Sequence, residues 1–269
     1  MIGLTNRRLG WLTAALVTVL YLLRVTEGQE QQFYFRILLN GLQNNAGSTA
    51  SEWLYSANLW FTILVPLMAA VPFLFPLEDS LQGGCWRAQV SRTGIRGFLL
   101  RSHLANLAAG SGFVTLGYAV YALLCYICLP NRSDMNYDTG DVTYYRAMPD
   151  PAELGGILLR LLTFALVCML TASFCMLTMQ LTKNKFRGIG IPMILNYLLD
   201  TLAGKLVVQT EPFDQRWELL SPSSLLSNTD AWFPRTFSAP LWWLYAGVLL
   251  LILLLNAASA ALMKRRVRW

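Results

Sequence analysis

The sequence predicts an all-α integral membrane protein. Of its 269 residues, 55% are apolar and only 13% are charged, and the mean hydropathy is +0.44. Soluble domains carry about 25% charged residues, so this deficit of charge indicates a bilayer environment. The apolar residues also fall into long runs, close to the roughly 20 residues that a helix needs to cross the hydrocarbon core. Six such runs predict six transmembrane helices within a single transmembrane domain, residues 1–269.

The predicted spans follow one another along the whole chain. They cover residues 9–25, 54–75, 104–129, 155–181, 189–208 and 240–263. The first is short and the fifth is the least apolar. Arg7 and Arg8 precede the first run, as in a signal peptide, but no small-residue cleavage site follows it. We therefore expect this run to be retained as a span.

Two features of the spans predict how they bend and pack. Pro66 and Pro72 are expected to kink the second span, and Pro192 lies just inside the fifth. Neighbouring helices can satisfy the backbone groups that such prolines release. In the third span, the Ala108-x-x-x-Gly112 spacing predicts a close approach of helices within the chain.

The distribution of charge predicts the orientation of the spans. Lysine and arginine gather on the cytoplasmic side of membrane proteins. With both termini inside, the cytoplasmic segments hold thirteen cations and two acids, whereas the other eight cations and thirteen acids lie in or near the outer loops. The thirteen are Arg7, Arg8, Arg87, Arg92, Arg96, Arg101, Lys183, Lys185, Arg187, Lys264, Arg265, Arg266 and Arg268. A model with five spans would place either the 183–187 cluster or the 264–268 cluster of cations outside the cell. Six spans with cytoplasmic N- and C-termini are therefore predicted.

Residues 78–103, between the second and third spans, combine charge with amphipathicity. The segment opens with two acids and continues with four arginines, and apolar residues separate the arginines. Its members are Glu78, Asp79, Trp86, Arg87, Val90, Arg92, Ile95, Arg96, Phe98, Leu99 and Arg101. Such a segment predicts a short amphipathic helix on the cytoplasmic face. From the residues alone, docking to a soluble partner and lying on anionic lipid are both open.

The residue types that catalysis usually needs are scarce. His103 is the only histidine, and no phosphate-binding P-loop is present, since Gly204-Lys205 is followed by Leu206 and lacks the upstream glycine. The five cysteines are Cys85, Cys125, Cys128, Cys168 and Cys175. Their one Cys-x-x-Cys pair has no second pair or histidine near it, which favours small apolar core residues over a metal site. We expect a non-catalytic chain that binds no metal and no cofactor.

The fifth predicted span contains charged residues. Asp200 and Lys205 lie within it, after Asn196. Charged groups inside spans are functional candidates by default. At a spacing of five, Asp200 and Lys205 lie about 140° apart on an ideal helix, too far for a good ion pair. Either the helix breaks near Gly204 and both groups reach outer interfacial water, or the polar residues line a substrate path.

The arrangement of residues 78–103 resembles that of the permease subunits of bacterial type 2 ATP-binding-cassette exporters, in the drug- and bacteriocin-export branches. In that family an acidic residue, a glycine, a Ser/Thr-Arg pair and a downstream basic residue mark a coupling helix between the second and third of six spans. Glu78-Asp79, Gly83-Gly84, Ser91-Arg92 and Arg101 stand at matching positions. Leu220-Ser221-Pro222 is similar to part of the family's outer re-entrant hairpin. The chain departs from the family at its N-terminus, where a longer amphipathic helix is usual.

The resemblance implies a permease subunit in the bacterial cytoplasmic (inner) membrane. Two permease subunits, identical or paralogous, would enclose the substrate path, and two separate ATPase subunits, which bind ATP and Mg, would dock beneath them. The implied coupling residues are Glu78, Asp79, Gly84, Trp86, Arg87, Val90, Ser91, Arg92 and Ile95, with Trp86, Val90 and Ile95 as apolar anchors. The candidate path residues are Asn196, Asp200 and Lys205. No nucleic-acid partner is expected, because the positive charge is sorted by loop.

Two other functions are open from the sequence. A stand-alone multipass factor, such as an immunity or assembly protein, would bind through its outer loops without an ATPase. An ion-coupled transporter would use Asp200 and Lys205, although six spans without a detectable inverted repeat disfavour it. Dependence on an ATPase subunit separates the exporter from both.

Overall fold

The structure is a computed structural model that describes residues 7–23, 33, 35–39, 64, 67–129, 154–209 and 242–267. Nearly all of these residues are helical, which confirms the all-α prediction for this part of the chain. The elements are α1 (Arg7–Leu23), α5 (Leu74–Gln82), α6 (Trp86–Cys128), α8 (Leu154–Thr182), α9 (Lys185–Gln209) and α12 (Trp242–Val267). Most of the predicted outer loops, including Leu220-Ser221-Pro222, lie outside the described residues.

Three of the helices are long and apolar enough to cross a membrane. These are Trp86–Cys128, Ile157–Thr182 and Tyr245–Val267, at the positions of the third, fourth and sixth predicted spans. They indicate a membrane protein. Helices also lie at the first and fifth positions, but α1 has only 17 residues and α9 interrupts its apolar sequence with Asp200 and Lys205. A total of six spans stays a prediction.

The second predicted span is interrupted at Pro72, where a kink was predicted. Residues 67–70 are helical, 71–73 form a turn that includes Pro72, and α5 begins at Leu74. Pro76 lies in the first turn of α5, where the missing N–H removes no intrahelical bond. One face of α5 is buried and carries Leu74, Leu77, Glu78 and Leu81. The rest of this predicted span lies outside the part of the chain that the structure describes.

The helix α6 is two helices joined at a glycine. Gly94 has φ 71° and ψ 163°, far from helical values, and it separates residues 86–93 from residues 95–128. The second part is about 50 Å long at 1.5 Å per residue, well beyond a hydrocarbon core of about 30 Å. Part of this helix must therefore lie outside the hydrocarbon core, and the predicted span boundary at residue 104 stays a prediction. The helix continues towards Gly94 with Arg96 and Arg101 exposed.

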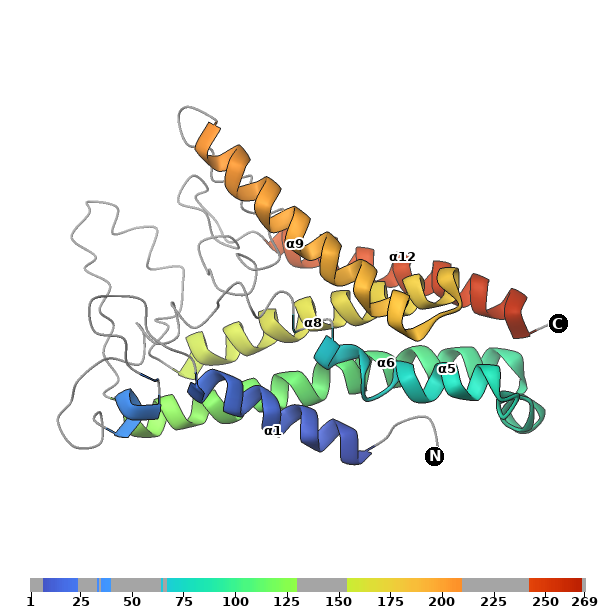
Figure 1. Ribbon diagram of the computed structural model, residues 1–269, viewed down its shortest axis with the longest axis horizontal. Helices are drawn as coiled ribbons and strands as arrows, with labels where there is room; N and C mark the ends of the chain where they lie inside the picture. Colours follow the sequence, from blue (N-terminus) through green and yellow to red (C-terminus); the bar gives the residue numbers. More distant parts are fainter. Residues whose placement is uncertain are drawn as a thin grey trace.

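The helices alternate in direction along the bundle, as Figure 1 shows. The first residues of α1, α6 and α9 and the last residues of α8 and α12 lie towards one end, and α5 runs towards the same end. We call it the basic end, because the segments that meet there carry twelve of the fifteen described lysines and arginines, namely Arg7, Arg8, Arg87, Arg92, Arg96, Arg101, Lys183, Lys185, Arg187, Lys264, Arg265 and Arg266. This grouping is what alternating spans require. That the basic end faces the cytoplasm stays a prediction.

Two apolar clusters hold the bundle together. One joins α1, α6, α8 and α12 and contains an aromatic stack in which Tyr118 lies 4.2 Å from Phe164 and 4.9 Å from Tyr21, measured between ring centroids. The other lies nearer the basic end and joins α5, α6, α8, α9 and α12 around residues such as Leu77 and Met263. We call the second one the basic-end cluster.

Candidate functional site

The helix α5 brings two adjacent acids, Glu78 and Asp79, to the basic end. Consecutive residues of a helix point about 100° apart, so the two carboxylates face different surroundings. Glu78 lies on the buried face with Leu77 and Leu81 and is completely buried. The side chain of Asp79 is 58% exposed.

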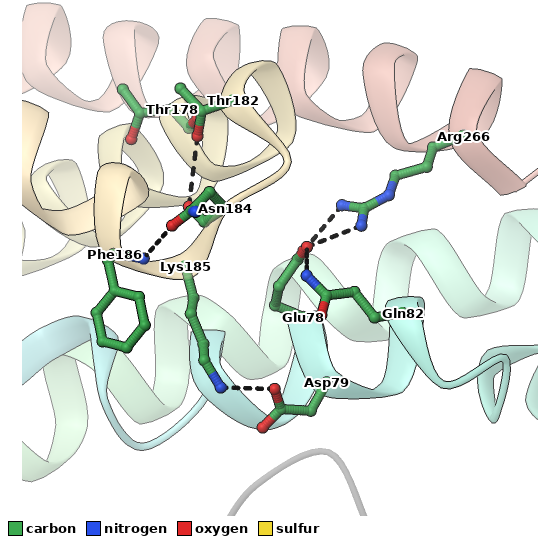
Figure 2. A network of polar contacts seen from close by, with 9 residues as sticks. All are labelled: Glu78, Asp79, Gln82, Thr178, Thr182, Asn184, Lys185, Phe186 and Arg266. Atoms are coloured by element: carbon green, nitrogen blue, oxygen red, sulfur yellow. Dashed lines mark hydrogen bonds and ion pairs between the residues drawn. The ribbon is translucent and has the colours of Figure 1, made fainter.

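Glu78 forms a bidentate ion pair with Arg266 near the end of α12 (Figure 2). The Arg266 Nη1 and Nη2 groups donate to the Glu78 Oε2 and Oε1 atoms at 2.8 Å each, and Gln82 Nε2 donates to Oε1 at 2.9 Å. Two parallel bonds of this kind combine strength with a defined geometry. Because the carboxylate is buried, removing one partner leaves an uncompensated charge, which costs roughly 3–5 kcal/mol. The pair therefore fixes α5 against α12.

Asp79 forms a second ion pair, with Lys185 at the start of α9. The Lys185 Nζ atom lies 2.7 Å from Asp79 Oδ1 and 5.4 Å from the centre of the Phe75 ring. Figure 2 shows both ion pairs beside each other at α5. We call Glu78–Arg266 and Asp79–Lys185 together the clasp. An exposed pair contributes only about 0–1 kcal/mol, so the first pair dominates its stability.

The turn between α8 and α9 presents Lys185 to α5. Lys183 adopts φ 51°, a left-handed conformation that ends α8. Asn184 then caps α9, since its Oδ1 atom accepts the backbone N–H groups of Phe186 at 2.8 Å and Arg187 at 3.2 Å. The Thr178 hydroxyl also donates to the Gly188 carbonyl at 2.7 Å. These bonds make the turn a defined structure in which α9 begins at Lys185.

Residues 86–93 form a short helix between two glycines in left-handed conformations. Gly84 has φ 75° and Gly94 has φ 71°, values that favour glycine. We call this segment the 86–93 helix. Its exposed face carries Arg87, Ala88, Ser91 and Arg92, which fall within one arc of the helical wheel. A basic, solvent-facing surface about 12 Å long results.

The apolar face of the 86–93 helix lies against the protein itself. Trp86 and Val90 of this helix, and Ile95 just beyond Gly94, are half-buried and pack on the basic-end cluster. The resemblance implied that these three residues anchor a partner, whereas the structure places them towards their own chain. The Arg87 guanidinium lies 5.7 Å from the centre of the Trp86 ring. Of the implied coupling residues in this helix, Arg87, Ser91 and Arg92 are the accessible ones.

The candidate path residues lie elsewhere. Asn196 and Asp200 are half-buried one turn apart on α9, and Lys205 is exposed further along. The helix α9 is continuous through Gly204 to Gln209, so the interpretation that it breaks near Gly204 was wrong. Figure 1 shows this part of α9 leaving the other helices and pointing away from the basic end. The structure does not bring these residues near the 86–93 helix.

Sequence reasoning missed a polar contact among α6, α8 and α12. His103 Nδ1 lies 2.9 Å from Asn256 Oδ1, and Asn256 Nδ2 donates to Ser173 Oγ at 2.8 Å. Asn106 Nδ2 donates to the Ala172 carbonyl at 3.0 Å. The signal in the sequence is the isolated polar residues within the apolar runs of these three helices, among which only His103 was singled out.

Neither metal chemistry nor similarity to other proteins adds to this picture. Within the described ranges, no three His, Cys, Asp or Glu side chains gather where they could hold a metal ion, and all five cysteines are free thiols. Comparisons of the chain with protein-family models, with curated proteins and with solved structures find no match. The function is therefore argued from the residues at the basic end.

Proposed function

We propose that this chain is the permease subunit of an ATP-driven exporter of the bacterial inner membrane. In this proposal it forms the substrate path as a dimer with a second permease subunit, and it couples to separate ATPase subunits through residues 78–103. The observation that carries the proposal is the 86–93 helix, a short helix at the basic end between Gly84 and Gly94 whose exposed face is basic.

The connections of the 86–93 helix suit a coupling role. On one side it continues through Gly94 into the long membrane helix, residues 95–128. On the other side it follows α5, which the clasp joins to α9 and α12. A displacement of the 86–93 helix would therefore reach residues 95–128 of α6 directly, and would reach α9 and α12 through Asp79 and Glu78. Ion pairs and a short stretch of backbone thus link the 86–93 helix to the helices that would move.

The exposed face of the helix also defines the chemistry of the partner. Arg87 and Arg92 lie on that face, and Arg96 is exposed just beyond Gly94. A complementary surface on the ATPase subunit would be acidic, since opposite charge steers association and sets the register of docking. Because the apolar face is turned to the protein's own core, docking depends on these cations more than on apolar anchors.

Co-purification of ATP hydrolysis with the chain tests the proposal. The chain is purified from native membranes in mild detergent as wild type and as Arg92→Glu, and the eluates are assayed for ATPase activity and for a polypeptide with a P-loop. We expect wild type to bring a P-loop ATPase and Arg92→Glu to lose most of it. Arg265→Glu, which makes the same charge change at an exposed site on α12, is the matched control and should retain it.

Absence of a P-loop ATPase from the wild-type eluate would contradict the proposal and favour a stand-alone multipass factor. Equal loss in Arg92→Glu and Arg265→Glu would show a general dependence on positive charge and would remove the coupling role of the 86–93 helix. Transport that needs no ATPase and is abolished by Asp200→Asn would favour the ion-coupled alternative.

A further inference from the structure

A cluster of buried polar side chains lies where α6, α8 and α12 meet. We call it the polar seam. Hydrogen bonds join His103 of α6, Asn256 of α12 and Ser173 of α8, and Asn106 of α6 bonds the backbone of α8 at Ala172. We count with it the buried serines that lie near these residues in sequence, Ser102 of α6 and Ser259 of α12. All but Asn256 are at most 7% exposed. Polar groups in such a place are costly to bury and are functional candidates by default. The proposed function makes no use of them.

The hydrogen bonds of Asn256 determine the tautomer of His103. Asn256 Nδ2 donates to the Ile252 carbonyl at 2.8 Å, and a carbonyl oxygen can only accept, so the amide nitrogen must lie on that side. Asn256 Oδ1, itself only an acceptor, then faces His103 Nδ1 at 2.9 Å. The proton of the bond must come from Nδ1. In the neutral ring, Nε2 consequently has a lone pair and no hydrogen.

The same reasoning applies to Asn106 one turn further along α6. Its Nδ2 group donates to the Ala172 carbonyl at 3.0 Å, which leaves Oδ1 as an acceptor. His103 Nε2 and Asn106 Oδ1 are both buried, and no described residue gives either of them a hydrogen bond. A buried acceptor that lacks a hydrogen bond destabilises the folded protein. Two acceptors cannot satisfy one another.

A ligand that donates hydrogen bonds would satisfy both acceptors. Two hydroxyl oxygens of the polar seam, Ser102 Oγ and Ser259 Oγ, are likewise buried and have no partner within the described part of the chain. Hydroxyls can donate as well as accept. Water donates two hydrogen bonds and accepts others, and buried waters typically make about three bonds to such groups. The polar seam thus has the hydrogen-bonding complement of a water site.

We propose that the polar seam is a binding site for internal water, in which a water molecule donates to His103 Nε2. Water at this site also donates a hydrogen bond to Asn106 Oδ1. The hydroxyls of Ser102 and Ser259 complete the site. The site connects three helices at one level of the bundle, and it does not depend on the exporter proposal.

Because His103 is the only histidine, labelling with [15N]histidine gives one imidazole signal set from the full-length chain. Solid-state NMR of the protein in lipid bilayers reads the protonation of each ring nitrogen, and transfer of magnetisation from water protons reads hydration. We expect a protonated Nδ1, an unprotonated Nε2 and transfer from water to Nε2. A proton on Nε2, in the other tautomer or in a doubly protonated ring, would overturn the proposal, as would an Nε2 that receives nothing from water.

Variants separate the site from the fold. Asn106→Leu should leave the tautomer unchanged and reduce water transfer to Nε2 several-fold, and undiminished transfer would count against the site. Thr163→Val is the matched control, because it removes a different buried polar contact between α8 and α12, the 3.0 Å bond to the Tyr245 hydroxyl. Its histidine spectrum should equal that of wild type. The wild-type spectrum decides the question even where a variant fails to fold.

Discussion

At the scale of the residue, Glu78 and Asp79 show how far burial changes the worth of a carboxylate. Both carry one negative charge and both have a cationic partner within 2.8 Å. Glu78 is enclosed with its partner, whereas Asp79 and Lys185 keep contact with water. Solvent screens the attraction between Asp79 and Lys185, so removal of either side chain costs little free energy. The two neighbours should therefore respond very differently to the same substitution.

Glu78→Gln should destabilise the protein by about 3–5 kcal/mol, because it leaves the Arg266 guanidinium largely buried without its counter-charge. Asp79→Asn, the same chemical change one residue away, should cost about 0–1 kcal/mol. Unfolding in mixed micelles with increasing denaturing detergent measures both free energies. The double variant Glu78→Leu with Arg266→Met should recover much of the loss, since an apolar replacement leaves no buried charge. Equal costs for the two single variants would contradict the described burial of Glu78.

The pairing of these acids and cations could not be predicted from the sequence, because the partners lie far apart along the chain. The charge pattern singled out Glu78, Asp79, Lys185 and Arg266 as members of cytoplasmic segments, but nothing local states which acid faces which cation. Glu78 and Arg266 are 188 residues apart. Their pairing follows only once α5 and α12 have packed together.

At the scale of the element, Gly94 decides where one helix ends and the next begins. Its φ of 71° with ψ of 163° falls in a region used almost only by glycine. No atom lies within 4 Å of the position where a Cβ would be. A side chain at this position would therefore act through the backbone alone. Gly97, three residues on, is an ordinary helical glycine.

Gly94→Ala should destabilise the bend by about 1–3 kcal/mol through backbone strain. Gly97→Ala should be neutral or stabilising by up to about 1 kcal/mol, since alanine favours helix and the added Cβ makes an ordinary 3.4 Å contact with Thr93. Detergent unfolding again gives the free energies. In the exporter proposal, Gly94→Ala should also weaken coupling of the co-purified ATPase, and Gly97→Ala should not. A stabilising effect of Gly94→Ala would show that the two parts of α6 form one straight helix.

Long apolar runs predicted the long helices well, because an apolar run of sufficient length has few other structures available to it. The predicted span 155–181 corresponds to α8, and 240–263 lies within α12 apart from its first residues. For Trp86, Val90 and Ile95, the resemblance implied one set of apolar anchors for a partner. Whether that set faces a partner or its own core depends on tertiary packing, and here it packs on the basic-end cluster.

At the scale of the whole molecule, α6 is the helix around which the described bundle is built. Its glycines allow close approach of other segments. A Cβ on Gly117 would overlap Ala14 and Val17 of α1. A Cβ on Gly110 would lie 2.7 Å from the Ala172 Cβ of α8 and 3.0 Å from the Ala69 carbonyl oxygen. The sequence pointed instead to Ala108 and Gly112, because small residues cluster there and spacing alone does not show which of them meets a neighbour.

Gly110→Ala should therefore separate α6 from α8 and destabilise the bundle by about 1–3 kcal/mol. Gly112→Ala, two residues away, meets nothing within 4 Å and should be neutral or slightly stabilising. Thermal unfolding of the two variants in the same detergent compares them directly. A larger effect at Gly112 would place the close contact on the other side of α6, where the predicted Ala108-x-x-x-Gly112 pattern puts it.

The placement of glycines at both ends of the 86–93 helix has a mechanical consequence. In the exporter proposal, the 86–93 helix would act as a lever that rotates about Gly94, with an arm as long as the helix, about 12 Å. Rotation of that arm by 10° carries its far end about 2 Å, which exceeds the tolerance of a hydrogen bond between about 2.7 and 3.2 Å. A partner that rotated the helix by this small angle would therefore make or break polar contacts at its far end. The number of residues between the two glycines sets how far the end of the helix moves for a given rotation.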